Sequence, residues 1–140
     1  MDIGVNYWAV LAAGASSLAV GFLWYGLIFK DEWIRLMGFT PESMKSMSMT
    51  PNKAYLLQFL ASLVMACVLA KVIFFKSLYL NLEGPMLGMM VGFWAWLGFV
   101  APVTLGAVLW EGKSWKLWYI NASNYLVTLV VMGAILSLWK

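Results

Sequence analysis

Four long stretches without a charged residue constrain the fold of this chain more than any other feature. They are residues 3–29, 54–70, 84–110 and 117–139, and their lengths are 27, 17, 27 and 23 residues. A helix that crosses the hydrocarbon core of a bilayer needs about 20 mostly apolar residues. Three stretches reach that length alone, and the second reaches it if Lys71 snorkels toward the interface and the apolar residues after it are included. The sequence therefore predicts a polytopic membrane protein.

The composition fits a single membrane domain over residues 1–140. Hydrophobic residues make up 64% of the 140 residues and charged residues 11%, whereas a soluble domain has about 45–50% apolar and about 25% charged residues. Four spans joined by short loops use nearly the whole chain. We expect an all-α four-helix bundle, with transmembrane helices at about 3–29, 53–75, 84–110 and 116–139.

The charged residues indicate what kind of partner the chain has. The net charge of +3 comes from lysines scattered over the loops, and it suits the anionic head groups of membrane lipids. No basic run is present, so we expect no nucleic-acid partner. Cys67 is the only cysteine, which leaves no intrachain disulfide, and the chain has no histidine.

The basic residues are distributed unevenly between the two sides of the predicted bundle. Six lie in the loops at 30–53 and 111–116, namely Lys30, Arg35, Lys45, Lys53, Lys113 and Lys116, and three lie on the other side, namely Lys71, Lys76 and Lys140. The positive-inside rule places both loops in the cytoplasm and both termini outside the cell membrane. The ratio leaves dual topology open as an alternative.

The loop at 30–53 contains two signals for the start of a helix. Thr40-Pro41-Glu42 combines a capping hydroxyl, a proline at the first helical position and an acid in the first turn. Thr50-Pro51 repeats the cap and the proline before the second span. We expect short helices that lie at the membrane interface between the first two spans.

Pro102 predicts a kink in the third span. A proline cannot donate to the carbonyl four residues back, and its ring crowds that carbonyl. The residue four positions back is Gly98, which leaves room for a bend. The Gly98–Pro102 segment is a candidate hinge, and the alternative is a kink that only shapes helix packing.

Small residues recur every four positions in three spans and predict close helix contacts, because helices in lipid associate through such residues. The candidate packing residues are Ala13, Ser17 and Gly21 in the first span, and Gly88 and Gly92 in the third, with Ser62, Ala66 and Ala70 in the second. Four helices offer few buried faces. We therefore expect one of these stripes to serve a homo-oligomer.

The spans lack the residue types that most membrane enzymes and transporters use. No Asp, Glu, Arg or His lies in any of the four predicted transmembrane helices, although buried ionisable groups usually mark function in membranes. This argues against a central carboxylate, a histidine-ligated metal, a haem centre and a catalytic triad. We expect no metal and no cofactor, and the sequence favours a non-enzymatic role.

Uncharged polar side chains from three spans are predicted to converge in the half of the bundle near the loops at 30–53 and 111–116. A rise of 1.5 Å per residue places Gln58, Thr104, Asn121 and Asn124 at similar depth, with Tyr125 and Glu111 nearby. Trp96 lies near mid-depth, where an indole N–H needs a partner. These seven residues are the candidate ligand-binding site. The alternative is that they only form hydrogen bonds between helices.

Five segments resemble a known family. They are GFLWYG at 21–26, WIRLMG at 33–38, WLGFV at 96–100, LWEGKSWKLWYINA at 109–122 and VVMGAIL at 130–136. The chain is similar to a family of small four-helix integral membrane proteins, bacterial and fungal, catalogued as a domain of unknown function. Its relatives often have a histidine near the position of Asn124 and Tyr125, so a histidine-based chemistry is not implied for this chain. The resemblance implies the architecture and no activity.

Three functional hypotheses follow. The leading one is binding or permeation of a small or lipidic ligand through the polar cluster near the cytoplasmic side. The second is a structural or accessory membrane subunit that acts through helix–helix contacts. The third is a lipid-modifying membrane enzyme that uses Glu111 or Tyr125 with a borrowed cofactor.

Overall fold

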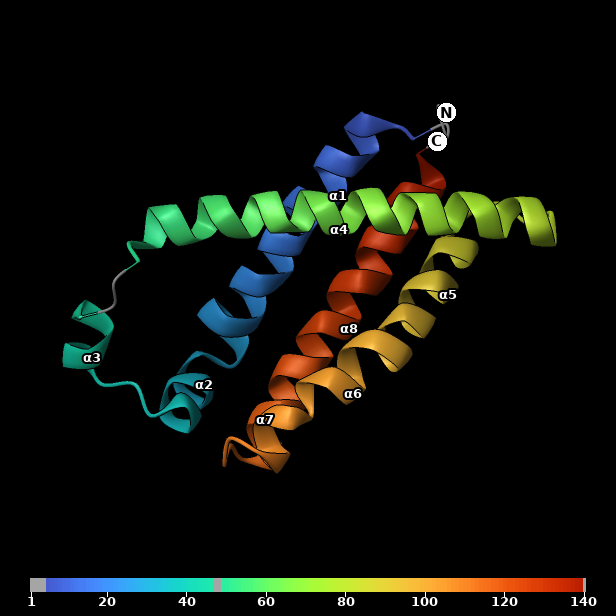
Figure 1. Ribbon diagram of the computed structural model, residues 1–140. Helices are drawn as coiled ribbons and strands as arrows, with labels where there is room; N and C mark the ends of the chain where they lie inside the picture. Colours follow the sequence, from blue (N-terminus) through green and yellow to red (C-terminus); the bar gives the residue numbers. More distant parts are fainter. Residues whose placement is uncertain (1–4, 47–48, 140) are drawn as a thin grey trace.

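The computed structural model describes residues 5–46 and 49–139, and throughout these parts the chain forms helices and turns without a strand (Figure 1). Four helices are long and apolar enough to cross a membrane, at Tyr7–Ile28, Pro51–Leu80, Pro85–Leu109 and Trp115–Leu138. The predicted all-α fold with four such helices is confirmed. Residues 3–4 were predicted to begin the first helix, and Lys140 was counted among the basic residues. Both lie beyond the described residues, and so do the two chain ends in the predicted topology.

The first span changes its winding partway along. Helix α1 (Tyr7–Gly21) begins at Asn6, whose side chain caps it, and continues as the π-helical segment η1 (Phe22–Ile28). The two short helices α2 (Lys30–Met37) and α3 (Pro41–Lys45) then lead toward the second span. They are the short helices predicted for this loop.

The helix starts follow the predicted capping signals. The Thr40 hydroxyl accepts a hydrogen bond from the Ser43 backbone N–H at 3.0 Å, and the Ser43 hydroxyl accepts one from the Thr40 N–H at 2.8 Å, which completes a capping box. The Thr50 hydroxyl accepts from the Lys53 N–H at 3.4 Å at the start of the second span.

The second span is one continuous helix, α4 (Pro51–Leu80), and it runs past the predicted end at residue 75. Lys71 ends the uncharged stretch, but the helix continues past both Lys71 and Lys76. Lysine is a good helix former, and both side chains are exposed. The helix stops where Asn81 adopts a left-handed conformation with φ 51°.

The third span is broken where the kink was predicted. Helix α5 (Pro85–Ala95) passes into the π-helical segment η2 (Trp96–Val100), and the short helices α6 (Ala101–Thr104) and α7 (Gly106–Leu109) follow. The wider winding immediately precedes Pro102. Single π-turns of this kind occur where the regular hydrogen-bond ladder is interrupted.

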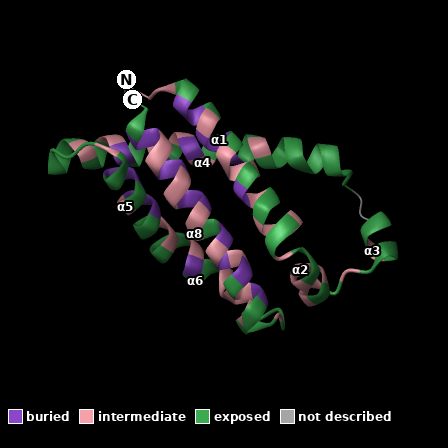
Figure 2. Ribbon diagram, turned by 180° about the vertical axis from the view of Figure 1, so that it is seen from behind, coloured by how far each residue is buried: buried purple, intermediate pink, exposed green. Residues whose placement is uncertain are grey.

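The last helix, α8 (Trp115–Leu138), is the centre of the molecule. It begins at Ser114, whose hydroxyl accepts from the Leu117 N–H at 3.1 Å. Its most apolar part is half buried, a larger fraction than in the other three spans, and buried positions run along its length (Figure 2). Helices α1 and α5 flank α8, while α4 crosses the other spans and projects beyond them at both ends (Figure 1).

Helices α5 and α8 meet through their backbones. A Cβ atom on Gly88 would overlap the Gly133 carbonyl, and one on Gly92 would overlap the Leu129 carbonyl. The Ser137 hydroxyl also donates a hydrogen bond to the Gly84 carbonyl. Such close approach is the usual basis of helix association in lipid.

The small-residue stripes of α1 and α4 face each other. Ala13 and Ala66 are fully buried, and the Ser62 hydroxyl donates to the Ser17 hydroxyl at 3.0 Å. Gly21 differs, because no neighbouring atom lies within 4 Å of the position its Cβ would occupy. The stripes pack mainly inside one chain, so the expected homo-oligomer stays a prediction without support from them.

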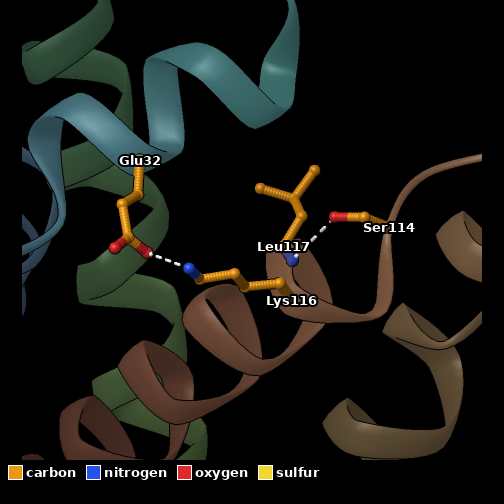
Figure 3. A network of polar contacts seen from close by, with 4 residues as sticks. All are labelled: Glu32, Ser114, Lys116 and Leu117. Atoms are coloured by element: carbon orange, nitrogen blue, oxygen red, sulfur yellow. Dashed lines mark hydrogen bonds and ion pairs between the residues drawn. The ribbon is translucent and has the colours of Figure 1, made fainter.

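An ion pair links α2 to the start of α8. The Lys116 ammonium lies 3.0 Å from a Glu32 carboxylate oxygen, next to the Ser114 cap (Figure 3). Both side chains are about half exposed. The contact places α2 beside the end of the bundle where the candidate site lies.

Candidate functional site

Two tryptophans, one from each π-helical segment, bind the backbone of α8. The Trp24 indole N–H donates to the Ile120 carbonyl at 3.0 Å, and the Trp96 indole N–H donates to the Ala122 carbonyl at 2.8 Å. The Trp24 indole also lies 3.2 Å from the Ser123 hydroxyl oxygen. The indole N–H of Trp96, a predicted ligand-binding residue, is therefore used in a hydrogen bond between helices.

A tyrosine from η1 connects to the polar face of α8. The Tyr25 hydroxyl donates to the Asn121 side-chain oxygen at 2.8 Å. The same hydroxyl lies near the side chains of Asn124 and Tyr125. The sequence alone assigns Tyr25 no partner, and its contact with α8 is apparent only from the packing.

A cavity of about 420 Å³ lies between the α1–η1 span, α2, α4 and α8. We call it the Asn124 cavity. Its polar lining comes mainly from Ser17, Tyr25, Gln58, Asn124, Tyr125 and Thr128. Trp33 of α2 and Met65 of α4 supply part of its apolar wall, and no charged residue lines it.

The Asn124 side chain has an unusual environment in this cavity. Asn124 is only 6% exposed, and its side-chain oxygen has no hydrogen-bond partner among the described residues. Buried polar atoms nearly always have a partner, and an unpaired one costs about 1–3 kcal/mol. Asn124 is one of the lining residues, so a donor bound in the cavity would supply a partner to this side chain.

A second cavity of about 520 Å³ lies between the α6–α7 segment, the following turn and α8. We call it the Glu111 cavity, and Thr104, Glu111, Lys113, Asn121 and Tyr125 are among its lining residues. Tyr125 lines both cavities. The two cavities therefore adjoin at this side chain.

Thr104 is occupied by local contacts. Its hydroxyl donates to the Val100 carbonyl at 2.8 Å and accepts from the Trp118 indole N–H at 3.2 Å. The first bond pairs the Val100 carbonyl, two residues before Pro102, where the regular backbone hydrogen bonds of the helix are interrupted. Thr104 thus supports the broken helix as well as lining the Glu111 cavity.

The structure divides the predicted ligand-binding residues into two groups. Gln58, Asn124 and Tyr125 line the Asn124 cavity, whereas Thr104, Glu111 and Asn121 line the Glu111 cavity with Tyr125. Trp96 lines neither of them.

Sequence reasoning did not include Tyr25, Trp33 and Thr128 in the site. Tyr25 and Trp33 resemble the aromatic residues that anchor any membrane helix. The signal for Tyr25 was the pair Asn121 and Asn124, since two amides at one depth need partners from another helix. Thr128 follows Asn124 by one helical turn and therefore shares its face.

Within residues 5–46 and 49–139, no group of three or more His, Cys, Asp or Glu side chains is placed to hold a metal ion. The polar groups of both cavities are amides and hydroxyls, with a carboxylate and an ammonium in the Glu111 cavity. These groups donate and accept hydrogen bonds, and they suit binding of an organic molecule.

Comparison with known proteins gives a match to a family model. The family model described as "Protein of unknown function (DUF1761)" matches residues 8–137, nearly the whole chain. This confirms the resemblance to a domain family of unknown function. No curated protein and no solved structure matches the chain.

Proposed function

Because the chain belongs to the DUF1761 family, which is described without a function, we propose its function from geometry: it binds a small amphiphilic molecule in the Asn124 cavity. The observation that supports this is the buried Asn124 oxygen without a partner among the described residues. A volume of about 420 Å³ lies within the usual range for ligand pockets, about 300–1,000 Å³.

The lining indicates the chemistry of the ligand. An acceptor without a partner requires a donor, so the ligand carries an O–H or N–H group. No charged residue lines the cavity, and an ionised group would lose hydration there without a counter-charge. The polar end is therefore neutral, such as an alcohol. The apolar wall, which includes Leu18, Phe22 and Met65, suits a hydrocarbon body.

The surroundings suggest a route from the membrane interface. Tyr55 and Gln58 lie on the first turns of α4 and are exposed, and Trp33 comes from the short helix α2. An amphiphile at the interface would meet these side chains first. Its hydrocarbon part would then pass between η1 and α4 toward Asn124.

Photoaffinity labelling with a matched pair of probes tests the proposal. The first probe is a twelve-carbon alcohol with a diazirine in its chain, and the second is its methyl ether, which cannot donate. In lipid nanodiscs we expect the alcohol to label peptides that contain Met65 or Trp33. We expect several-fold weaker labelling by the ether and in Asn124→Leu.

The control variant is Trp96→Phe, which alters another contact on α8 without lining the cavity. Its labelling by the alcohol should equal that of the unmodified protein. Equal labelling by alcohol and ether, or labelling of Asn124→Leu at full strength, would reject the proposal.

We further propose that the Asn124 cavity opens toward the cytoplasmic leaflet. This rests on the six basic residues at 30–53 and 111–116 and on the positive-inside rule. In a Cys67→Ser background, Leu82→Cys should react with an impermeant maleimide on intact cells. Ser46→Cys should react only after permeabilisation, and reaction of both on intact cells would indicate dual topology.

A further inference from the structure

A groove between α4 and α5 differs from both cavities described above. Its volume is about 700 Å³, and its lining is almost wholly apolar. Val68 and Val72 of α4 form one wall, Met90 and Trp94 of α5 form the other, and Leu129 of α8 lies at the floor. We call it the α4–α5 groove. The wall side chains Val68, Val72 and Trp94 are exposed, so the groove opens to the surroundings of the bundle.

One charged residue, Lys76, lines this groove. It lies near the end of α4, and no carboxylate among the described residues forms an ion pair with it. An ammonium beside an apolar groove in a membrane helix is costly unless an anion or water meets it. The groove therefore offers an apolar trough with a positive charge toward one end.

We propose that the α4–α5 groove binds an anionic phospholipid, with an acyl chain along the trough and the phosphate beside Lys76. Basic residues at pockets between membrane helices are suited to anionic head groups. The hydrocarbon wall and the single ammonium match the two parts of such a lipid. This site shares only Met65 with the Asn124 cavity, whose lining has no charge.

A second copy of the chain fits the groove less well. Asp31, Glu32 and Glu42 lie in the connection at the start of α4, far along the sequence from Lys76, and Glu111 lies beyond α7. Glu83 is near the end of α4 but already has an interaction of its own. Within residues 5–46 and 49–139, a partner copy thus carries no carboxylate at the Lys76 end of the bundle besides Glu83, whereas every anionic phospholipid has a phosphate.

Lys71 provides a matched control on the same helix. It is also exposed and has no ion-pair partner among the described residues, but it does not line the groove. Five residues at 3.6 per turn place it on a different face of α4 from Lys76. Lys71→Gln and Lys76→Gln remove the same charge, and only the second removes it from the groove.

Native mass spectrometry of the full chain released from nanodiscs tests the proposal. The nanodiscs contain equal amounts of phosphatidylglycerol and phosphatidylcholine with the same acyl chains. We expect phosphatidylglycerol to be retained about fivefold more often, which corresponds to about 1 kcal/mol for one lysine at an anionic surface. Lys76→Gln should reduce this ratio toward one, and Lys71→Gln should leave it unchanged.

A second variant tests the groove itself. Val68→Trp places a large side chain in the trough without changing any charge, and the exposed position of Val68 leaves room for it. We expect less bound lipid of both kinds, with the helix content and elution volume of the unmodified protein. Unchanged lipid retention would show that the groove is not the binding site.

Other outcomes would also overturn the proposal. Equal effects of Lys71→Gln and Lys76→Gln would indicate diffuse attraction to the lipid surface. Bound free fatty acid in place of phospholipid, or a dimer that persists in Lys76→Gln without lipid, would assign the groove to another occupant. Asn124→Leu should leave the lipid ratio unchanged, so failure here is distinguishable from failure at the Asn124 cavity.

Discussion

The two ends of α8 are held by different kinds of contact. Toward its C-terminus, Gly88 and Gly92 of α5 touch the backbone at Gly133 and Leu129, and we call this the glycine crossing. Toward its N-terminus, the indoles of Trp24 and Trp96 and the phenol of Tyr25 reach across to α8, and cavities lie beside them. We call this part the cavity region. Small residues bring helices into contact, whereas large polar aromatics join helices that remain apart.

The difference shows where this fold has room for a ligand. Dispersion contacts and close packing hold membrane helices together in place of the hydrophobic effect. The glycine crossing has that packing and leaves no space between α5 and α8. In the cavity region, hydrogen bonds take the place of part of this close packing. The first and third spans also change there to π-helical winding, which is frequent at functional sites.

The largest expected effect is at the glycine crossing. Gly88→Ala should lower the free energy of unfolding by about 3 kcal/mol, because the added methyl group meets a backbone carbonyl that cannot move alone. Unfolding in detergent micelles by sodium dodecyl sulfate, followed by circular dichroism, measures it. Gly98→Ala is the control, since open space surrounds Gly98. Equal stability of the two variants would contradict the close crossing.

The next effect separates two neighbouring amides of the cavity region. Asn121→Leu leaves the Tyr25 hydroxyl without its acceptor and should cost about 1–2 kcal/mol. Asn124→Leu removes an oxygen that has no partner among the described residues, together with the amide N–H₂ group near the Tyr25 hydroxyl, and should cost less, about 1 kcal/mol or less. The same unfolding assay compares them. An equal or larger loss in Asn124→Leu would contradict an unpaired Asn124 oxygen.

The two indole bonds should contribute similar, smaller amounts. Trp24→Phe and Trp96→Phe should each lower stability by about 0.6–1.7 kcal/mol, the range for hydrogen bonds between membrane helices. Trp94→Phe is the control, because its indole makes no hydrogen bond in the described structure. No loss in either variant would show that the indoles only fill space.

The smallest effect is expected for the ion pair between Glu32 and Lys116. Both side chains are about half exposed, so solvent screens them and the pair should contribute about 0.5 kcal/mol or less. A double-mutant cycle with Glu32→Gln and Lys116→Gln, measured at low and high salt, gives the coupling energy. A coupling above about 1 kcal/mol, insensitive to salt, would show that α2 is a rigid part of the cavity region.

The sequence anticipated part of the candidate site. Depth along the spans predicted that polar residues of several helices lie in one half of the molecule, and Gln58, Asn124 and Tyr125 line one cavity. The sequence did not predict which face of each helix points toward which cavity, because rotation about each helix axis depends on the neighbouring helix. Thr104 and Asn121 therefore lie on the Glu111 cavity, and Trp96 lies on neither.

The sequence by itself determined the four apolar helices, the capped starts at Thr40 and Thr50, and the interruption before Pro102. These features depend on local composition, on single capping side chains and on one missing N–H group. Only the tertiary structure decided that α8 is central, that Gly88 meets Gly133, and that the Asn124 oxygen remains unpaired. Each of these depends on how helices far apart in the sequence approach one another. Lipid is as apolar as the helix surfaces, so buried and lipid-facing positions do not differ in hydrophobicity, and the sequence alone does not distinguish them.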